Sequence, residues 1–247
     1  MPIRDDHPAI IFDLDGTLAD TLDDITVSLN HALERVGAPH RSRGQAMAMI
    51  GDGAVMLTRR ALGPHHEYRL DDALACFAAH YHAHALDHSR LFPGIDVQLD
   101  RLADTGWRFA ILSNKPHVYT RQCARVLLNR WRFTAIRGAV EHAPKKPDPA
   151  AARDIATRLQ TEPERIYFAG DSAVDIQTAR NAGMIAVACL WGYGDRHALQ
   201  SAGAQLTVRT PDDLASALET HAARQPAPLP THAGNKERHR PPRDADG

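Results

Sequence analysis

Short apolar segments recur along the chain, each followed by residues with helical spacing, and this alternation is the strongest constraint on the fold. Strands that alternate with helices are joined by right-handed crossovers, which build a mainly parallel sheet with helices on both faces. The sequence therefore predicts an α/β fold. The expected strands are residues 9–12, 108–112, 135–137, 166–169, 185–189 and 206–208.

One long interval interrupts this alternation, because the residues between Asp15 and Phe109 show helical periodicity and no convincing strand. Pro93 and Gly94 then mark the return to alternating strands and helices. We expect an inserted helical subdomain, a cap, within this interval. Its expected helices are residues 21–33, 53–62 and 71–86. The predicted domains are an α/β core at 1–18 and 93–221, the cap at 19–92 and a tail at 222–247.

The tail prediction rests on composition. From Ala222 onward the chain is rich in proline, arginine and histidine and has almost no apolar residues. Such a segment cannot bury enough apolar surface to offset the entropy lost on ordering, so a disordered tail is expected. Its arginines can contact an acidic partner, although a solvated tail is the simpler interpretation.

Composition and charge exclude several classes of partner. The chain has 247 residues, of which 43% are hydrophobic and 24% charged, and its formal net charge is -1. No global field would recruit nucleic acid or an anionic membrane, and no apolar run approaches the ~20 residues that span a bilayer. Three cysteines without CxxC spacing and an N-terminus without an apolar signal core favour a cytoplasmic location. We expect a monomer or a homodimer.

Two aspartates follow the first predicted strand. Strand side chains alternate between faces, so Asp13 and Asp15 can lie on one side of the backbone, where their charges would repel. A divalent cation relieves such repulsion, and hard oxygen ligands suit Mg²⁺. Gly16 permits a sharp turn, and Thr17 adds a hydroxyl beside the carboxylates. An ordinary Asp-Gly turn is the alternative interpretation.

Polar residues also follow the second predicted core strand and precede a later helix. Carboxyl ends of parallel strands share one edge, so Ser113 and Asn114 should lie near the first acidic pair. The Ser113 hydroxyl can hold a phosphoryl oxygen, or the pair can simply cap the next helix. One of Lys145 and Lys146 can place a positive charge beside a phosphate, and Lys146, directly before Pro147, is favoured.

A second acidic pair comes at the end of another predicted strand. Gly170, Asp171 and Ser172 form the turn after the strand, and Asp175 lies at the start of the following helix. The spacing can bring Asp171 and Asp175 to the same side of the turn, which would complete an acidic metal pocket. Helix capping is the alternative, because carboxylates near a helix start complement its dipole.

Histidines gather in the third helix expected in the cap. His80, His84 and His88 would share one face at four-residue spacing, which is compatible with a bound metal. No cysteine or glutamate accompanies them at metal-site spacing, so a solvated helix face is the favoured interpretation.

The four motifs DLDGTLAD, SNKP, KKPDP and GDSAVDI occur in an order that resembles phosphatases of the haloacid dehalogenase superfamily. The resemblance spans residues 9–218 and implies a Rossmann-like core with a helical cap inserted after the first strand. It also implies that a small phosphorylated metabolite is the substrate.

The resemblance implies roles for the motif residues. Asp13 would be the nucleophile that forms an aspartyl-phosphate, and Asp15 the general acid and then base. Mg²⁺ would be held by Asp13, Asp171 and the backbone carbonyl of Asp15. The phosphate-binding residues would be Ser113, Asn114 and Lys146, and the supporting residues Thr17, Gly170, Ser172 and Asp175.

The cap sequence carries the substrate hypothesis. Residues 48–62 are similar to the cap loop of phosphoglycolate phosphatases, in which a Gly-polar-Gly turn opens a helix. The backbone N–H groups of Gly51, Asp52 and Gly53 would suit a small carboxylate, and Arg59 or Arg60 can assist, although ordinary surface arginines are the favoured interpretation. The resemblance therefore implies 2-phosphoglycolate, with a sugar phosphate or N-acetylmuramic acid 6-phosphate as the alternative.

Three other functions are less favoured. A mutase resembling β-phosphoglucomutase lacks its usual cap signature here, and haloacid dehalogenases generally lack the second aspartate of the Asp13–Asp15 pair. A non-catalytic binding protein on the same fold is disfavoured because every catalytic position holds a competent residue. One departure from the phosphoglycolate branch is Asp148-Pro149, where a His-Pro pair is common, and it weakens the substrate prediction more than the chemistry.

Overall fold

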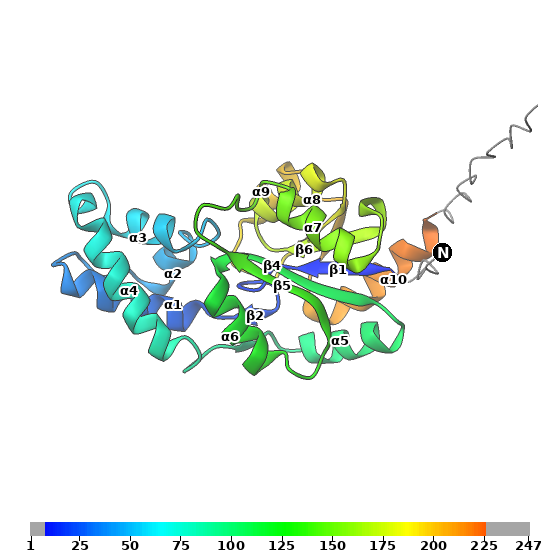
Figure 1. Ribbon diagram of the computed structural model, residues 1–247, viewed down its shortest axis with the longest axis horizontal. Helices are drawn as coiled ribbons and strands as arrows, with labels where there is room; N and C mark the ends of the chain where they lie inside the picture. Colours follow the sequence, from blue (N-terminus) through cyan, green and yellow to red (C-terminus); the bar gives the residue numbers. More distant parts are fainter. Residues whose placement is uncertain (1–7, 226–247) are drawn as a thin grey trace, which may run out of the picture.

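A six-stranded parallel sheet with the strand order β5-β4-β1-β6-β7-β8 lies at the centre of the molecule (Figure 1). The structure is a computed structural model that describes residues 8–225. The α/β prediction is confirmed, and each expected strand is present. The strands are β1 (Ala9–Phe12), β4 (Arg108–Pro116), β5 (Phe133–Ala139), β6 (Ile166–Gly170), β7 (Ile185–Cys189) and β8 (Leu206–Val208).

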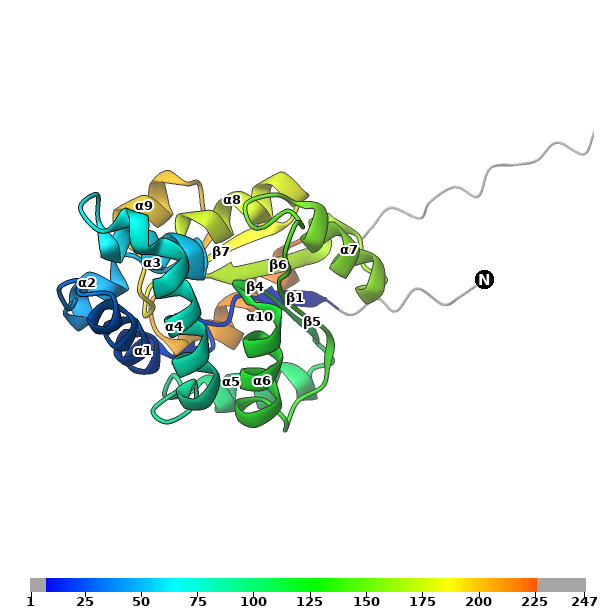
Figure 2. The same cartoon turned by 60° about the vertical axis from the view of Figure 1, so that its left-hand side comes forward.

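Helices cover both faces of this sheet (Figure 2). Every residue of β1 is buried, with Ile10 and Phe12 in one apolar layer and Ala9 and Ile11 in the other, as strand alternation requires. The first layer is completed by α5 (Ile95–Asp104), α6 (His117–Leu127) and α10 (Leu214–Arg224). The second is completed by α7 (Ala150–Leu159), α8 (Ala173–Ala182) and α9 (Arg196–Ser201).

The register of the sheet brings the ends of β1 and β6 to one level beside the middle of β4. Phe12, the last residue of β1, lies opposite Ile111 of β4 and Ala169 of β6. The residues that follow these strands, including Asp13 and Asp171, therefore meet at the carboxyl edge of the sheet. In open α/β sheets this edge is where ligands bind.

Four helices between β1 and α5 form the cap, seen at the left of Figure 1. They bury their own apolar core, which includes Leu29 and Leu33 of α1 and Phe77 and Tyr81 of α4. The helical insertion predicted from the sequence is thus confirmed. The cap helices are α1 (Leu22–Arg35), α2 (Arg43–Met47), α3 (Ala54–Leu62) and α4 (Leu70–His84).

Several elements differ from the sequence expectations. Helix α2 was not anticipated, although its signal is visible, because Ser42 and Gln45 form a capping box. The interval expected to lack strands contains β2 (Ala19–Asp20) and β3 (Arg90–Leu91), an antiparallel pair at the two ends of the predicted cap. Two residues per strand are too few to show alternation in the sequence.

The start of the predicted tail is also different. Helix α10 continues to Arg224, so the predicted boundary at Ala222 falls within a helix, because Leu214, Ala215 and Leu218 anchor it on the sheet. The remainder of the predicted tail, residues 226–247, lies outside the described residues.

Residues 8–225 contain no helix that combines the length and the apolar character needed to cross a membrane.

A buried carboxylate joins the two ends of the cap. Asp24 of α1 is 2% exposed and lies beside the segment that follows α4. Its carboxylate accepts the backbone N–H of Ser89 at 2.8 Å and of His88 at 3.0 Å, and the Ser89 hydroxyl at 2.6 Å. Buried backbone N–H groups need such partners, so Asp24 stabilises the return of the chain to the core.

The Asp24→Ala variant should lower the free energy of unfolding by about 2–4 kcal/mol, because two partly buried N–H groups and the Ser89 hydroxyl lose their acceptor. Urea unfolding followed by circular dichroism measures this change. Asp23→Ala is the matched control: Asp23 is in the same turn but pairs with Arg43 at the surface, where ion pairs contribute about 0–1 kcal/mol. Equal losses in both variants would contradict the role of Asp24.

Candidate functional site

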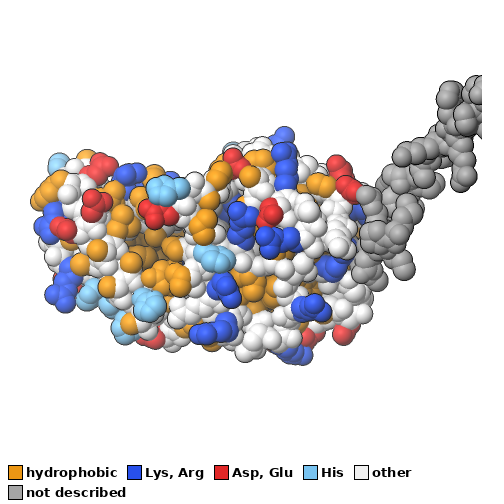
Figure 3. Space-filling model, in the orientation of Figure 1, with side chains coloured by type: hydrophobic (Ala, Val, Ile, Leu, Met, Phe, Trp, Pro, Cys, Tyr) orange, Lys and Arg blue, Asp and Glu red, His pale blue; other side chains and the backbone are white. Residues whose placement is uncertain are grey.

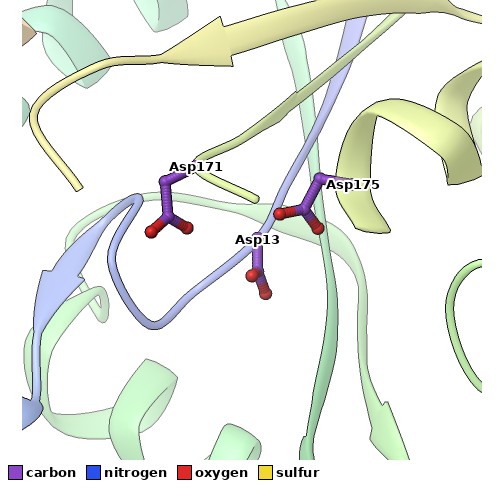
Figure 4. A group of neighbouring side chains, drawn as sticks. All are labelled: Asp13, Asp171 and Asp175. Carbon is purple, nitrogen blue, oxygen red and sulfur yellow. The ribbon is translucent and has the colours of Figure 1, made fainter. Parts of the chain in front are cut away.

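Three carboxylates converge at the carboxyl edge of the sheet (Figure 4). Asp13 follows β1, Asp171 follows β6, and Asp175 lies in the first turn of α8. All three are buried, and one carboxylate oxygen from each lies within 4.8 Å of the others. Among residues 8–225 they form the one group of three or more acidic, histidine or cysteine side chains with metal-binding spacing.

A lysine from another loop enters this group. Lys146 precedes α7, and its Nζ lies 3.0 Å from Asp13 Oδ1 and 2.6 Å from Asp175 Oδ1. Lys145 is exposed, so Lys146 is the one of the two lysines that reaches the carboxylates, as the sequence favoured. A buried ammonium between two carboxylates requires this close pairing.

Burial and charge shape the titration of the site. Burial raises the pKa of Asp13 to about 6, and the Lys146 ammonium opposes the shift. Burial, followed by the Asp175 and Asp13 carboxylates, raises the pKa of Asp171 to about 8. Burial by itself would lower the pKa of Lys146, but the Asp13 and Asp175 carboxylates outweigh it and raise that pKa above its ordinary value.

The donor set fits a hard divalent cation. Three ionised carboxylates and one ammonium would leave a net negative charge in a buried pocket, and this repulsion adds to the effect of burial in raising the pKa values of Asp13 and Asp171. A divalent cation bound by carboxylate oxygens would offset that charge, and oxygen ligands are those Mg²⁺ takes.

Asp171 is held in place by the loop that follows β1. Thr17 Oγ1 donates to Asp171 Oδ1 at 3.2 Å, and the backbone N–H of Tyr193 donates to Oδ2 at 2.7 Å. Gly16 has a φ of +81°, and a Cβ there would overlap the Asp171 carboxylate. Glycine is therefore required both for the turn and for the close approach.

Asp175 caps a helix, one of the two roles that the sequence left open, and it also pairs with Lys146. Its Oδ2 accepts the Ser172 backbone N–H and hydroxyl in a capping box at the start of α8. Its Oδ1 accepts from Lys146. Gly170 leaves room for it, because a Cβ at that position would overlap the Asp175 side chain. The capped helix therefore fixes the carboxylate that orients the lysine.

Asp15 lies beside Lys115, a residue to which the sequence motifs assigned no role. Lys115 Nζ donates to Asp15 Oδ1 at 2.9 Å and to the hydroxyl of Tyr81 at 2.6 Å, and Thr21 Oγ1 donates to the same Asp15 oxygen at 2.6 Å. Lys115 comes from the core and Tyr81 from the cap. The SNKP motif contained Lys115, but no sequence signal identified its partner across the interface.

Ser113 and Asn114 are buried residues within β4 and line the cavity described below. The Asn114 side chain is engaged by backbone groups: Nδ2 donates to Lys146 O at 3.1 Å and to Gly51 O at 3.0 Å, and Oδ1 accepts from Lys146 N at 3.0 Å. Asn114 was predicted to bind phosphate, but these bonds occupy both ends of its amide and give it a positioning role.

A cavity of about 660 Å³ opens between the sheet edge and the cap. Asp13, Asp15, Ser113 and Asp171 line its core end. The cap residues predicted to meet substrate divide into two pairs, of which Gly51 and Gly53 line the cavity and Asp52 and Arg59 do not.

Ion pairs account for the two cap residues outside the cavity. Arg59 Nε lies 3.1 Å from Glu67 Oε1, and Asp52 pairs with Arg60. Arg59 is thus a surface arginine, the alternative that the sequence left open.

Three cap histidines form a row of tilted rings. The rings of His31, His80 and His84 follow one another at centroid distances of 4.3 and 4.4 Å. His80 is half-buried and bonds to Ser28, while His88 contacts Asp24. Burial, followed by the neighbouring histidines, lowers the pKa of His80. The face is therefore only partly solvated.

Comparison with known proteins agrees with this architecture. Residues 10–189 match the haloacid dehalogenase-like hydrolase family. A phosphoglycolate phosphatase of Cereibacter sphaeroides is 36% identical over 195 residues, which cover 77% of this chain and 88% of the relative. A phosphoglycolate phosphatase of Rhodospirillum rubrum is 34% identical over 216 residues, covering 84% and 88%.

A crystal structure from Haemophilus somnus, described as a predicted phosphoglycolate phosphatase, superposes with a TM-score of 0.77 at 27% identity. The superposition covers 85% of this chain and 97% of that one. The sequence match, the shared fold and the acidic group at the sheet edge lead to one conclusion: the chain belongs to the haloacid dehalogenase-like hydrolase family.

Proposed function

We propose that this protein is a Mg²⁺-dependent phosphomonoester hydrolase that works through an aspartyl-phosphate. The observation that carries the proposal is the buried group of Asp13, Lys146 and Asp171 at the carboxyl edge of the sheet, where Asp13, Asp15 and Asp171 line the cavity. It supplies a nucleophile, a cation and metal ligands within one pocket.

Asp13 is the proposed nucleophile. Its Oδ1 accepts from the backbone N–H of Leu14 at 2.7 Å and lies 3.0 Å from Lys146, so the carboxylate is held in one orientation. Asp13, Asp171 and the Asp15 backbone carbonyl would hold Mg²⁺, which neutralises charge on the transferring phosphoryl group. Ser113 and Lys146 would bind the phosphoryl oxygens.

Asp15 is the proposed general acid and base. Lys115 and Thr21 both donate to its Oδ1, so a proton on Oδ2 leaves both bonds intact. From that oxygen the proton passes to the leaving oxygen as the P–O bond breaks. The carboxylate then takes a proton from the water that hydrolyses the aspartyl-phosphate.

The proposed substrate is 2-phosphoglycolate, because relatives that are 33–36% identical are named phosphoglycolate phosphatases. Its carboxylate would meet the backbone N–H groups of the turn from Gly51 to Gly53, which opens α3 and borders the cavity. A sugar phosphate or N-acetylmuramic acid 6-phosphate is the alternative, since the same core chemistry serves many phosphates.

The proposed substrate can be tested by comparing phosphate release from 2-phosphoglycolate with release from sugar phosphates. We expect kcat/KM for 2-phosphoglycolate to exceed that for N-acetylmuramic acid 6-phosphate and glucose 6-phosphate by about tenfold or more. A clear preference for either alternative would retain the chemistry and reject the proposed substrate.

The Asp13→Asn variant tests the nucleophile. Because an amide cannot form the aspartyl-phosphate, phosphate release should fall by at least about 10³-fold with an unchanged melting temperature. Asp100→Asn is the control, since Asp100 bonds to Trp131 and Arg130 away from the cavity. Substantial turnover by Asp13→Asn would contradict covalent catalysis by Asp13.

The raised pKa values predict how Mg²⁺ affects stability. Asp13 and Asp171 hold protons in the metal-free fold above the ordinary aspartate pKa, so they favour folding most at low pH. Their contribution is lost as pH rises from about 4 towards about 8. Mg²⁺ competes with those protons and should therefore raise the melting temperature more at about pH 9 than at about pH 6.

Thermal unfolding with EDTA and with Mg²⁺ at both pH values measures this difference. The Asp171→Asn variant should lose most of the Mg²⁺ effect, whereas the remote control Asp100→Asn should keep it. An equal Mg²⁺ effect at both pH values in the unsubstituted protein would contradict a cation that displaces protons from these carboxylates.

A further inference from the structure

The cavity has two chemically different ends. Its core end carries the carboxylates, and both cations that line it, Lys115 and Arg196, also come from the core. The cap end is built from apolar side chains on four helices and the turn before α3, and Figure 3 shows hydrophobic side chains gathered beside a hollow on the cap half. The apolar residues of the cap that line the cavity are Ile25, Met47, Ile50, Ala54, Leu57 and Phe77.

The cavity is large compared with a two-carbon acid. At the share of about 30 Å³ that a water molecule takes in the liquid, 660 Å³ corresponds to about twenty waters. Cavities of about 300–1,000 Å³ typically enclose ligands of several rings. A small acid bound at the Gly51–Gly53 turn would leave the apolar end filled only with water.

The charge of Lys115 is not directed into the apolar end. Its Nζ is engaged by Asp15 at 2.9 Å and by the hydroxyl of Tyr81 at 2.6 Å. An anionic group placed among the cap side chains would lose hydration without gaining a cation there. Arg196, the other cation that lines the cavity, belongs to α9 of the core. The apolar side chains of the cap therefore favour an uncharged group packed against them, whereas a carboxylate would lie at the backbone N–H groups of the Gly51–Gly53 turn.

Aromatic rings form one wall. Phe77 and Tyr81 stack at a centroid distance of 5.3 Å with an interplanar angle of 9°, and Tyr119 packs edge-on to Tyr81 at 5.1 Å. Lys115 holds the hydroxyl of Tyr81, which fixes this wall relative to Asp15. Flat aromatic walls bind planar rings by stacking and edge contacts.

We propose that the enzyme also hydrolyses phosphomonoesters whose leaving group is an uncharged ring system, bound in the apolar end of the cavity. The proposal rests on the proposed function. The Asp13 carboxylate forms a bond to phosphorus, the bond to the aryl oxygen breaks, and Asp15 gives that oxygen its proton. Water then cleaves the aspartyl-phosphate, so that the products are the aryl alcohol and phosphate.

Phenyl phosphate and 1-naphthyl phosphate form a matched pair of probes, because their leaving oxygens are chemically similar and the second adds one apolar ring. With the Mg²⁺-loaded enzyme, KM for 1-naphthyl phosphate should be at least about tenfold lower than for phenyl phosphate. An equal or higher KM would overturn the proposal.

Variants then locate the binding site. Ala54→Phe places a ring in the apolar end and should lower kcat/KM for 1-naphthyl phosphate at least about tenfold more than for 2-phosphoglycolate. Val55→Phe adds the same ring on the exposed side of α3 and should change neither value. Met47→Gln introduces polarity at similar volume and should also act selectively on the naphthyl ester, which serves if Ala54→Phe does not fold.

The outcomes separate the two proposals. If Ala54→Phe and Met47→Gln lower kcat/KM equally for 1-naphthyl phosphate and 2-phosphoglycolate, with unchanged melting temperatures, the apolar end is rejected as the site of the leaving group. No phosphate release from any ester by the unsubstituted enzyme, or full release by Asp13→Asn, would instead reject the proposed hydrolase function.

Discussion

The ion pair network around Lys146 is the interaction on which the rest of the site depends. Its ammonium lies between Asp13 and Asp175 in a pocket that excludes most water, so removing it would leave buried charges without a partner. Three separate segments supply these groups: the end of β1, the loop before α7 and the first turn of α8. The pairing therefore fixes the relative positions of chain segments that are far apart in sequence.

Much of the fold was predictable, because each core strand is an apolar run and parallel strands share one edge. That rule alone brings Asp13 near Asp171. The contact between Lys115 and Tyr81 was not predictable, since it crosses from core to cap and the helical spacing of Tyr81 identifies a buried face but not its partner. Asn114 and Arg59 show the same limit: residue type suggested a ligand role, whereas tertiary partners determine what each side chain binds.

The core and the cap contribute different parts of the cavity. The core supplies charge at the strand ends, where backbone N–H groups and capped helices hold each carboxylate. The cap supplies apolar surface, because its four helices direct side chains both into their own core and towards the cavity. This division lets the cap lining vary while the reacting groups keep their geometry.

Asn114 connects these two parts through one amide. Its Nδ2 bonds both to Lys146 O in the core and to Gly51 O in the cap, within a single planar group. Withdrawal of the cap loop would break the second bond and leave the amide held on the core side alone, by its two bonds to the Lys146 backbone. The loop that carries Lys146 is therefore held most firmly when the cap lies over the sheet edge. Cap closure would then both fix the position of Lys146 and exclude water from the pocket.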